Sequence, residues 1–403
     1  MADATILKLF SQPFLSDFVW IPQTLPITHE EIVSLDKELY VYEQVFLNPD
    51  IEKNLISKNE LLASFAISKA EDSKLTLQEA QNVYKLILSD PNYDFIQEKL
   101  KAKEKLTYKD YDKLEFFNIA KTFRNQNLEL FSINNLSPLK IRELHRELTQ
   151  GLDIFREHLS GFTIYKSGRW RDNDRIRVGS YVPAPHTEIE EGIKELTSWL
   201  KENQTITGIA AFHAALYGLH PFNNGNKRVC RILEHILLRS LAVNKKNLYS
   251  TSYYYHKQKA RYYKYLLYSL ERKNLNHFVA FVLEALALSI IDVVKTSLEA
   301  KRQEFVRRYE LEGQMDIVLK PLIKRSEMQF KNLARQTYGK IARQTLVTYL
   351  SKAVDQGIIH KREAGKLTYY GLNFQAPETE TLQKWLTFVK GRLSYIPDDI
   401  RLV

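Results

Sequence analysis

The spacing of apolar residues along the chain predicts a protein built mainly from helices. From about residue 27 to residue 88, apolar residues recur every three or four positions, as they do on the buried face of a helix. Polar breaks near residues 48–50 and 72–74 divide this stretch into consecutive helices, and a charged helical stretch continues to about residue 130. Further helices are predicted over residues 137–159, 188–200, 208–219, 227–241, 254–270 and 275–309.

Residues 161–185 depart from this helical pattern. Gly168, a polar cluster at residues 172–174, Pro183 and Pro185 bracket short β-branched and aromatic runs. Such runs between turn-forming residues are typical of a β-hairpin, which we therefore expect here.

The C-terminal region has a pattern of its own. Helices are predicted over residues 330–338 and 341–356, and Gly357 is suited to cap the second of them. Residues 358–370 then alternate like a hairpin that turns at Ala364 and Gly365. This order of elements resembles a winged helix-turn-helix module, with residues 342–355 as the candidate recognition helix.

Length and composition narrow the class of protein. A chain of 403 residues exceeds what one hydrophobic core usually organises, so two or three packed units are expected. The single cysteine, Cys230, suits a reducing compartment, and the N-terminus lacks the pattern of a signal peptide, so we expect a cytoplasmic protein. The most apolar run, residues 278–294, is interrupted by Glu284 and Asp292, and we interpret it as a buried core helix with no role in a membrane.

Positive charge is concentrated near the C-terminus. The whole chain carries a formal charge of +10, and residues 321–370 alone hold ten Lys and Arg against three acids, a local net charge of +7. Because clustered charge of one sign attracts partners of the other, the C-terminal region is the part expected to meet an acidic partner.

The motif HPFNNGNKRVCR, which begins at His220, carries the strongest chemical signal. His220 is expected to end a helix, because Pro221 disfavours helical geometry in the residue before it, and Gly225 allows a sharp turn before the next helix begins. The backbone N–H groups of Gly225, Asn226 and Lys227 would then point out of the helix start, where the helix dipole favours an anion.

Basic and titratable side chains flank this predicted anion site. Arg228 and Arg231 are three residues apart, so they share one helix face and can bind phosphate. His220 has an imidazole that titrates near neutrality and can accept a proton from an attacking hydroxyl. The histidines and the cysteine nearby lack the closely paired spacing of zinc ligands, so a zinc site is not favoured.

This motif resembles the signature of the Fic/Fido family, which runs His, any residue, Phe, any residue, Asp or Glu, Gly, Asn, Gly, Arg, two residues and Arg. The resemblance covers roughly residues 40–290. It implies one role for each matching position: His220 as general base, Phe222 as loop anchor, Gly225 and Asn226 as the anion hole, Arg228 as a phosphate contact and Arg231 as the clamp for the terminal phosphate.

Two further segments extend the resemblance. Residues 171–185 look like the flap hairpin with which the family docks the backbone of its target, and this implies target-binding roles for Ile176, Arg177 and Val178. Residues 252–266 look like a later helix of the family, in which Tyr262 and Tyr263 would approach the base or ribose of the nucleotide.

Two motif positions depart from the family pattern. Asn224 stands where the family has its acidic magnesium ligand, and an amide oxygen is a weaker partner for this hard cation. Lys227 stands where the second glycine belongs. The triplet from Asn226 to Arg228 resembles the Doc branch, in which the nucleotide lies reversed and a phosphoryl group is transferred.

Residues 66–80 resemble the family's inhibitory helix, which offers a glutamate to the second arginine of the motif, here Arg231. Glu71 is the candidate for that glutamate. An alignment that starts at Ser64 would place Ser68 in its position instead, and an ordinary solvated glutamate is the other interpretation of Glu71.

The resemblance implies a mainly α fold, with a Fic-type helical bundle, a β-hairpin flap and a C-terminal winged helix. Its regions would be an N-terminal helical region with the candidate inhibitory helix (1–130), the catalytic core (131–300) and the winged-helix domain with a tail (301–403). The leading hypothesis is a protein adenylyltransferase that uses ATP and Mg²⁺ to transfer AMP to a hydroxyl of a target protein. A Doc-like protein kinase and a DNA-binding regulator with a degenerate Fic site are the alternatives, and formation of a homodimer is left open.

Overall fold

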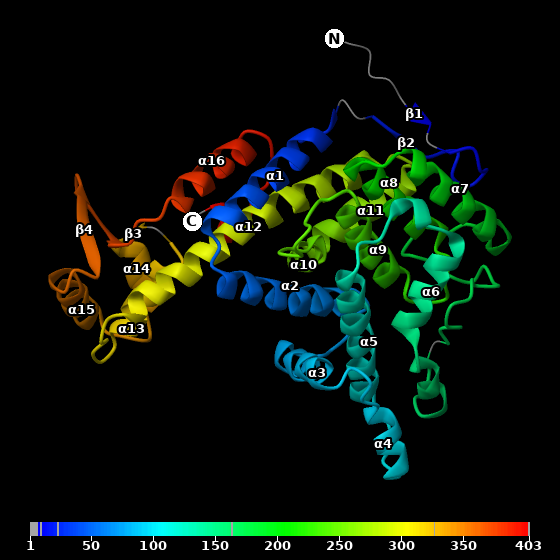
Figure 1. Ribbon diagram of the computed structural model, residues 1–403, viewed down its shortest axis with the longest axis horizontal. Helices are drawn as coiled ribbons and strands as arrows, with labels where there is room; N and C mark the ends of the chain where they lie inside the picture. The colour runs from blue at the N-terminus through cyan, green and yellow to red at the C-terminus, as the bar shows by residue number, and fades with distance from the viewer. Residues whose placement is uncertain (1–6, 9, 22–23, 163, 326, 402–403) are drawn as a thin grey trace. The chain divides into compact units, whose positions relative to one another are not determined.

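The computed structural model describes residues 7–8, 10–21, 24–162, 164–325 and 327–401. The chain divides into two compact units, one comprising Met1–Tyr40 with Lys53–Ser289 and the other Val41–Glu52 with Ile290–Val403. Helices dominate both units, and the strands of the described residues form two small antiparallel sheets, so the predicted mainly helical fold is confirmed (Figure 1).

The first unit joins the two regions expected at residues 1–130 and 131–300, so the structure has no unit boundary near residue 130. Three helices, α1, α2 and α12, contribute residues to both units. The elements up to α12 are β1 (Leu7–Lys8), β2 (Val19–Trp20), α1 (His29–Phe46), α2 (Pro49–Lys69), α3 (Leu77–Ser89), α4 (Phe95–Lys101), α5 (Tyr108–Leu128), α6 (Pro138–Thr149), α7 (Ile189–Glu202), α8 (Ile206–Leu219), α9 (Asn226–Ser240), α10 (Thr251–Lys257), α11 (Lys259–Glu271) and α12 (Asn276–Arg307).

These helices lie close to the predicted ranges, with two differences. The helix predicted to reach residue 159 ends at Thr149, because Gly151 adopts a left-handed conformation with φ 73° and a 3₁₀ helix follows over Leu152–Glu157. The helix predicted over residues 254–270 is divided at Gln258, which ends α10 and precedes α11.

The core of the first unit is built around α8. All fourteen residues of α8 are buried, because its sequence is apolar on every side and only a helix surrounded by protein can accommodate that pattern. The Thr205 side chain caps it by accepting a hydrogen bond from the Gly208 N–H at 2.9 Å. Helix α9 packs along α8, and the two helices are joined by the short loop that carries the motif (Figure 1).

Helix α12 is the one described helix that is long and apolar enough to cross a membrane, but 83% of its most apolar window is buried inside the protein. The apolar run at residues 278–294 lies within it. The interpretation of this run as a buried core helix is therefore confirmed.

Among the described residues of the segment 161–185, the expected hairpin is reduced to one antiparallel bridge, between Val178 and Tyr181. The polar groups of this segment bond to side chains in place of a strand ladder. The guanidinium of Arg171 donates to the carbonyl oxygens of Asn173 and Ala184, and Asp174 accepts from the His186 N–H at 2.7 Å. The predicted hairpin is therefore limited to the turn between Val178 and Tyr181, and hydrogen bonds of the buried Arg171 organise much of the remaining segment.

The second unit contains a three-stranded antiparallel sheet in the order β3-β5-β4. The predicted hairpin with its turn at Ala364 and Gly365 is confirmed by the register that pairs Ala364 with Leu367, and Gly357 follows α15 with φ 71°. The winged-helix interpretation of this arrangement stays a prediction. The elements are α13 (Met315–Ile323), β3 (Glu327–Gln329), α14 (Phe330–Thr337), α15 (Arg343–Asp355), β4 (Ile359–Ala364), β5 (Leu367–Leu372), α16 (Glu378–Lys390) and α17 (Asp398–Arg401).

Candidate active site

His220 occupies the C-cap of α8 in a left-handed conformation, with φ 50° and ψ 60°. This conformation is unfavourable for a residue with a side chain, so neighbouring groups must stabilise it. The Arg171 Nε donates to the His220 carbonyl oxygen at 2.8 Å, and the Arg171 backbone N–H donates to the Pro221 carbonyl oxygen at the same distance. Arg171 therefore fixes the backbone of His220, the candidate base.

The loop after His220 is closed by the side chain of Asn226. Its amide accepts from the Phe222 N–H at 3.0 Å and donates to the Phe222 carbonyl oxygen at 2.8 Å. Gly225 precedes α9 with φ 82°, and no described side chain accepts a hydrogen bond from the N–H groups of Asn226 or Lys227. The start of α9 therefore presents the N–H groups of Asn226 and Lys227 and the positive end of its dipole. The Gly225 N–H, which was expected to join them, donates instead to the Asn224 side-chain oxygen at 2.8 Å.

His145, on α6, contacts this loop through its imidazole ring. Its ring stacks on Phe222 with centroids 3.8 Å apart and planes 3° apart. Its Nδ1 accepts from the Gly168 N–H at 2.9 Å, so its Nε2 carries the proton and donates to the Asn224 carbonyl oxygen at 3.1 Å. The ring is thus a fixed, neutral bridge between the loop and the segment that contains Arg171.

Arg228 does not face a phosphate site, which corrects the role expected for it. Its guanidinium is fully buried and forms an ion pair with Glu115 on α5 at 3.0 Å. It also donates to the Tyr165 hydroxyl at 3.1 Å and lies over the Tyr165 ring. Because both charges are compensated in the core, Arg228 anchors α9 to α5.

Arg231 lies among aromatic rings at the end of α2. Its guanidinium is 4.5 Å from the centre of the Tyr262 ring and 5.5 Å from that of Tyr255, and its Nη1 donates to the Ala66 carbonyl oxygen at 3.1 Å. Tyr262, which the resemblance places beside a nucleotide, is fully buried beneath this guanidinium. Its hydroxyl contacts His213 Nε2 at 3.2 Å.

The segment after α2 meets the motif at Lys227. The Lys227 Nζ donates to the Ala70 carbonyl oxygen at 3.1 Å and lies 3.5 Å from a carboxylate oxygen of Glu71. The Tyr263 hydroxyl donates to the same Ala70 carbonyl at 2.8 Å. Glu71 thus pairs with Lys227 and not with Arg231, the partner that the resemblance implies.

Asn224 does not offer a metal site. Its side-chain oxygen accepts a hydrogen bond from the Gly225 N–H at 2.8 Å and so is turned towards the protein backbone. Across the described residues, no group of three or more His, Cys, Asp or Glu side chains could hold a metal ion. The residues present therefore do not form a protein ligand set for Mg²⁺.

The segment with the flap residues contacts the motif loop. The Asn173 amide donates to the Asn223 side-chain oxygen at 3.1 Å, and the Tyr181 hydroxyl donates to the Gly218 carbonyl oxygen at 3.2 Å. Ile176 and Val178 are partly exposed between these contacts, and Arg177 is exposed. The three predicted target-binding residues therefore lie on an accessible strip beside the loop.

The protonation states suit a site that attracts anions. Burial, with the charges of Arg171 and Lys227, lowers the pKa of His220 to about 3, so its ring is neutral and has a lone pair for a proton. Burial opposes the charge of Lys227, but Glu71 and Tyr263 outweigh it, so the pKa of this amine is raised.

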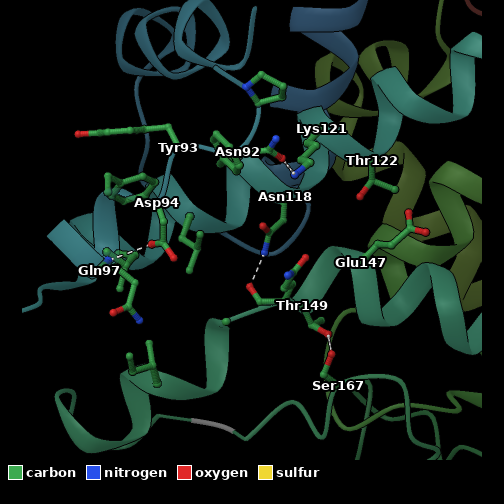
Figure 2. A pocket seen from close by; sticks show the side chains of 18 of the residues that line it. Asn92, Tyr93, Asp94, Gln97, Asn118, Lys121, Thr122, Glu147, Thr149 and Ser167 are labelled. Carbon is green, nitrogen blue, oxygen red and sulfur yellow. Dashed lines mark hydrogen bonds between the residues drawn. The ribbon is translucent and has the colours of Figure 1, made fainter. Parts of the chain in front are cut away.

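A separate cavity of about 470 Å³ lies between α4, α5 and the segment after α6 (Figure 2). In it, Asn118 donates to the Gln150 carbonyl oxygen and Thr149 to the Ser167 hydroxyl, both at 2.8 Å. No residue of the motif lines this cavity, so it forms no part of the candidate active site.

Sequence reasoning found the motif but missed Arg171, His145 and Glu115. The only signal for His145 is its place on the inner face of a predicted helix, beside Leu144 and Leu148, where a polar residue needs partners. Nothing in the sequence indicates that Glu115 pairs with Arg228, because this contact joins residues 113 positions apart.

Comparison with known proteins assigns the class of this site. The model of the Fic/DOC family matches residues 135–238, which include α6, α7, α8 and most of α9. Residues 135–238, which carry the motif, therefore match the Fic/DOC family.

One similar curated protein is the protein adenylyltransferase fic-1 of Caenorhabditis elegans, 28% identical over 92 residues. The match spans 22% of this chain and only 18% of that protein. A solved structure of a Fic family protein from Desulfovibrio desulfuricans G20 aligns over 86% of this chain and 96% of its own, with 17% identity and a TM-score of 0.48. Fic-1 (residues 134–508) from C. elegans aligns over 68% and 72%, with the same identity and TM-score.

Replacing Arg171 by lysine tests its hold on the loop. An amine cannot donate to the carbonyls of Asn173, Ala184, Leu219 and His220 together, so Arg171→Lys should lower the free energy of unfolding by roughly 2–4 kcal/mol. The measurement is urea unfolding followed by tryptophan fluorescence. The exposed Arg175→Lys is the matched control and should change the same quantity by less than about 0.5 kcal/mol. Equal effects of the two changes would contradict the assigned role.

Acidification should destabilise the first unit. Burial lowers the pKa values of His145, His220 and His235 to about 3, whereas unfolded histidine titrates near pH 6.5, so the unfolded chain binds more protons as the pH falls below that value. Each histidine then removes about 1.4 kcal/mol per pH unit. The buried Glu115 has the opposite sign, because its pKa is raised to about 7.

The net loss between pH 6 and pH 5 should therefore be about 3 kcal/mol, measured as the unfolding free energy at the two values. His235→Gln should remove the contribution of one histidine from this pH dependence, whereas substitution of the exposed His277 should leave it unchanged. Stability that does not depend on pH in this range would contradict the neutral state of the three rings.

Proposed function

We propose that this chain transfers the adenylyl group of ATP to a hydroxyl side chain of a target protein. The observation that carries the proposal is the neutral imidazole of His220 held next to the uncapped start of α9, with Lys227 and Arg231 on that helix. The Fic/DOC match over residues 135–238 and the similarity to an adenylyltransferase support the same reaction class.

In this reaction, His220 takes the proton of the target hydroxyl while the hydroxyl oxygen forms a bond to the α-phosphorus. The bond from this phosphorus to the bridging oxygen breaks, and pyrophosphate leaves. The free N–H groups at the start of α9 are suited to stabilise the charge on the phosphate oxygens. A bound triphosphate also favours the protonated imidazole, so it raises the pKa of the base towards the range in which proton transfer is efficient.

The end of α2 would restrain this activity. Lys227 and Arg231, the two motif cations closest to α2, donate to the carbonyl oxygens of Ala70 and Ala66, and Glu71 compensates the lysine. A bound triphosphate would need the same two cations as contacts for its phosphate groups. We therefore propose that the segment 66–71 and the nucleotide compete for them.

Lys227 favours a second candidate function, transfer of the terminal phosphoryl group. A lysine at this position adds a charge at the anion site that a glycine would not supply, and this charge suits a nucleotide bound in the reversed orientation. The DNA-binding regulator with a degenerate site, the third hypothesis, concerns the second unit.

The position of the transferred label distinguishes the two enzymes. The protein, a cell lysate as a source of targets and Mg²⁺ are incubated with ATP labelled at the α- or the γ-phosphate. Label from the α-position alone should enter protein, and His220→Ala should lower its rate by about a hundredfold or more, since the base is lost. Label from the γ-position alone would favour phosphoryl transfer. The absence of both labels, also with Glu71→Gly, would contradict an enzymatic role.

The proposed restraint predicts an effect on nucleotide affinity. Glu71→Gly removes the partner of Lys227, so the Kd for ATP, measured by calorimetry, should fall roughly three- to tenfold. Asp72→Asn is the matched control, because Asp72 is exposed and pairs with Lys259, which lies outside the motif, and its charge acts on Lys227 more weakly than that of Glu71. Unchanged affinity in Glu71→Gly, or an equal gain in both variants, would contradict competition at Lys227.

A further inference from the structure

The exposed side of α15 carries side chains suited to hydrogen bonding. Leu346, Leu350 and Ala353 turn into the core of the second unit. The opposite side of the helix exposes, in order, Arg343, Gln344, Val347, Thr348, Ser351 and Lys352. This side contains no acidic residue before Asp355, at the end of the helix. Such a surface is suited to bind an anionic partner that also offers hydrogen-bonding groups.

The surroundings of this helix add positive charge. Residues 330–352 contain five cations and no Asp or Glu. Lys331, Arg335, Lys340 and Arg343 are exposed, and no ion pair is recorded for them within the described ranges. By contrast, Arg362 on β4 is committed to Glu327 at 2.5 Å, and Lys352 lies 3.6 Å from Glu312. These four cations are therefore not neutralised by a neighbouring acid and can bind an external anion. The Arg343 guanidinium also lies over the Phe330 ring, 5.6 Å from its centre.

We propose that this surface of the second unit, α15 with residues 331–343, binds duplex DNA. A helix with its side chains is about 10–12 Å wide, and the major groove of B-DNA is about 12 Å wide. Gln344 and Thr348 can bond to base edges there, and the exposed Val347 can contact a thymine methyl group. The lysines and arginines are suited to the phosphates on either side.

Two other occupants fit less well. The major groove of double-stranded RNA is too narrow and deep for a helix, so RNA would leave Gln344 and Thr348 without partners. An acidic protein would be expected to use a cluster of apolar or aromatic anchors, whereas this surface exposes two large apolar side chains, Val347 on α15 and Tyr338 before it, among many charged and polar ones. Charge and hydrogen-bonding chemistry together therefore favour duplex DNA.

The test uses the full chain, because the second unit is not known to fold alone. A fluorescent duplex of about 30 base pairs and mixed sequence is titrated with protein at several KCl concentrations, and binding is followed by anisotropy. Arg343→Ala should weaken binding roughly fivefold or more. It should also reduce the slope of log K against log salt by about 0.9, as expected for one lost phosphate contact. Lys390→Ala, which removes one charge from an exposed position of α16, is the matched control and should change neither quantity.

The uncharged residues Gln344 and Thr348 provide a second test. A preferred DNA sequence is first selected from a random pool. The double variant Gln344→Ala with Thr348→Ala should then show a lower ratio of affinity for this sequence to affinity for random DNA, with an unchanged slope of log K against log salt. Absence of binding at low salt, tighter binding to duplex RNA, or equal losses in Arg343→Ala and Lys390→Ala would each overturn the proposal. The outcome is independent of the adenylyl transfer, because His220→Ala should bind DNA like the wild type.

Discussion

The left-handed turn at His220 is the constraint on which the active-site loop depends. An imidazole at the end of one helix meets the amide donors at the start of the next only if the chain reverses direction within five residues. A residue with a side chain adopts φ 50° only when other contacts offset the strain. Arg171 provides them, since it bonds to the His220 carbonyl and through its backbone to the Pro221 carbonyl.

The charges of this region are arranged so that the base stays neutral. Three cations stand within five residues of α9, and each has a different environment. Arg228 is neutralised in the core by Glu115, Arg231 lies against aromatic rings, and Lys227 is paired with Glu71 at the edge. Burial, with the charges of Arg171 and Lys227, makes protonation of the His220 ring unfavourable, which explains its lowered pKa. Lys227, which helps to suppress protonation of His220, would also attract the phosphates that later favour it.

Local patterns predicted most of the fold but few of the partners in the site. Apolar periodicity located the helices, and the positions of Pro221 and Gly225 predicted the end of α8 and the start of α9. The hairpin expected at residues 161–185 is much shorter than its β-branched and aromatic runs suggested, because such runs do not reveal a buried arginine that donates to carbonyl groups of the segment. Arg228 was misassigned for a similar reason. A helical periodicity shows which residues share a face, but not whether an acid from α5 covers that face.

The strength of the contacts at the end of α2 decides whether they can act as a reversible restraint. Three hydrogen bonds, from Lys227, Arg231 and Tyr263 to backbone carbonyls, hold the segment, and an ion pair at 3.5 Å adds to them. At about 0.5–1.5 kcal/mol for each hydrogen bond, the total is on the order of 2–5 kcal/mol. A nucleotide with an intrinsic Kd near 1 μM gains about 8 kcal/mol at the standard state, so the restraint would weaken its Kd to between roughly 30 μM and 5 mM without abolishing binding. Contacts of this strength suit a segment that a nucleotide can displace. Stronger contacts would keep the nucleotide site closed, and weaker ones would leave it open.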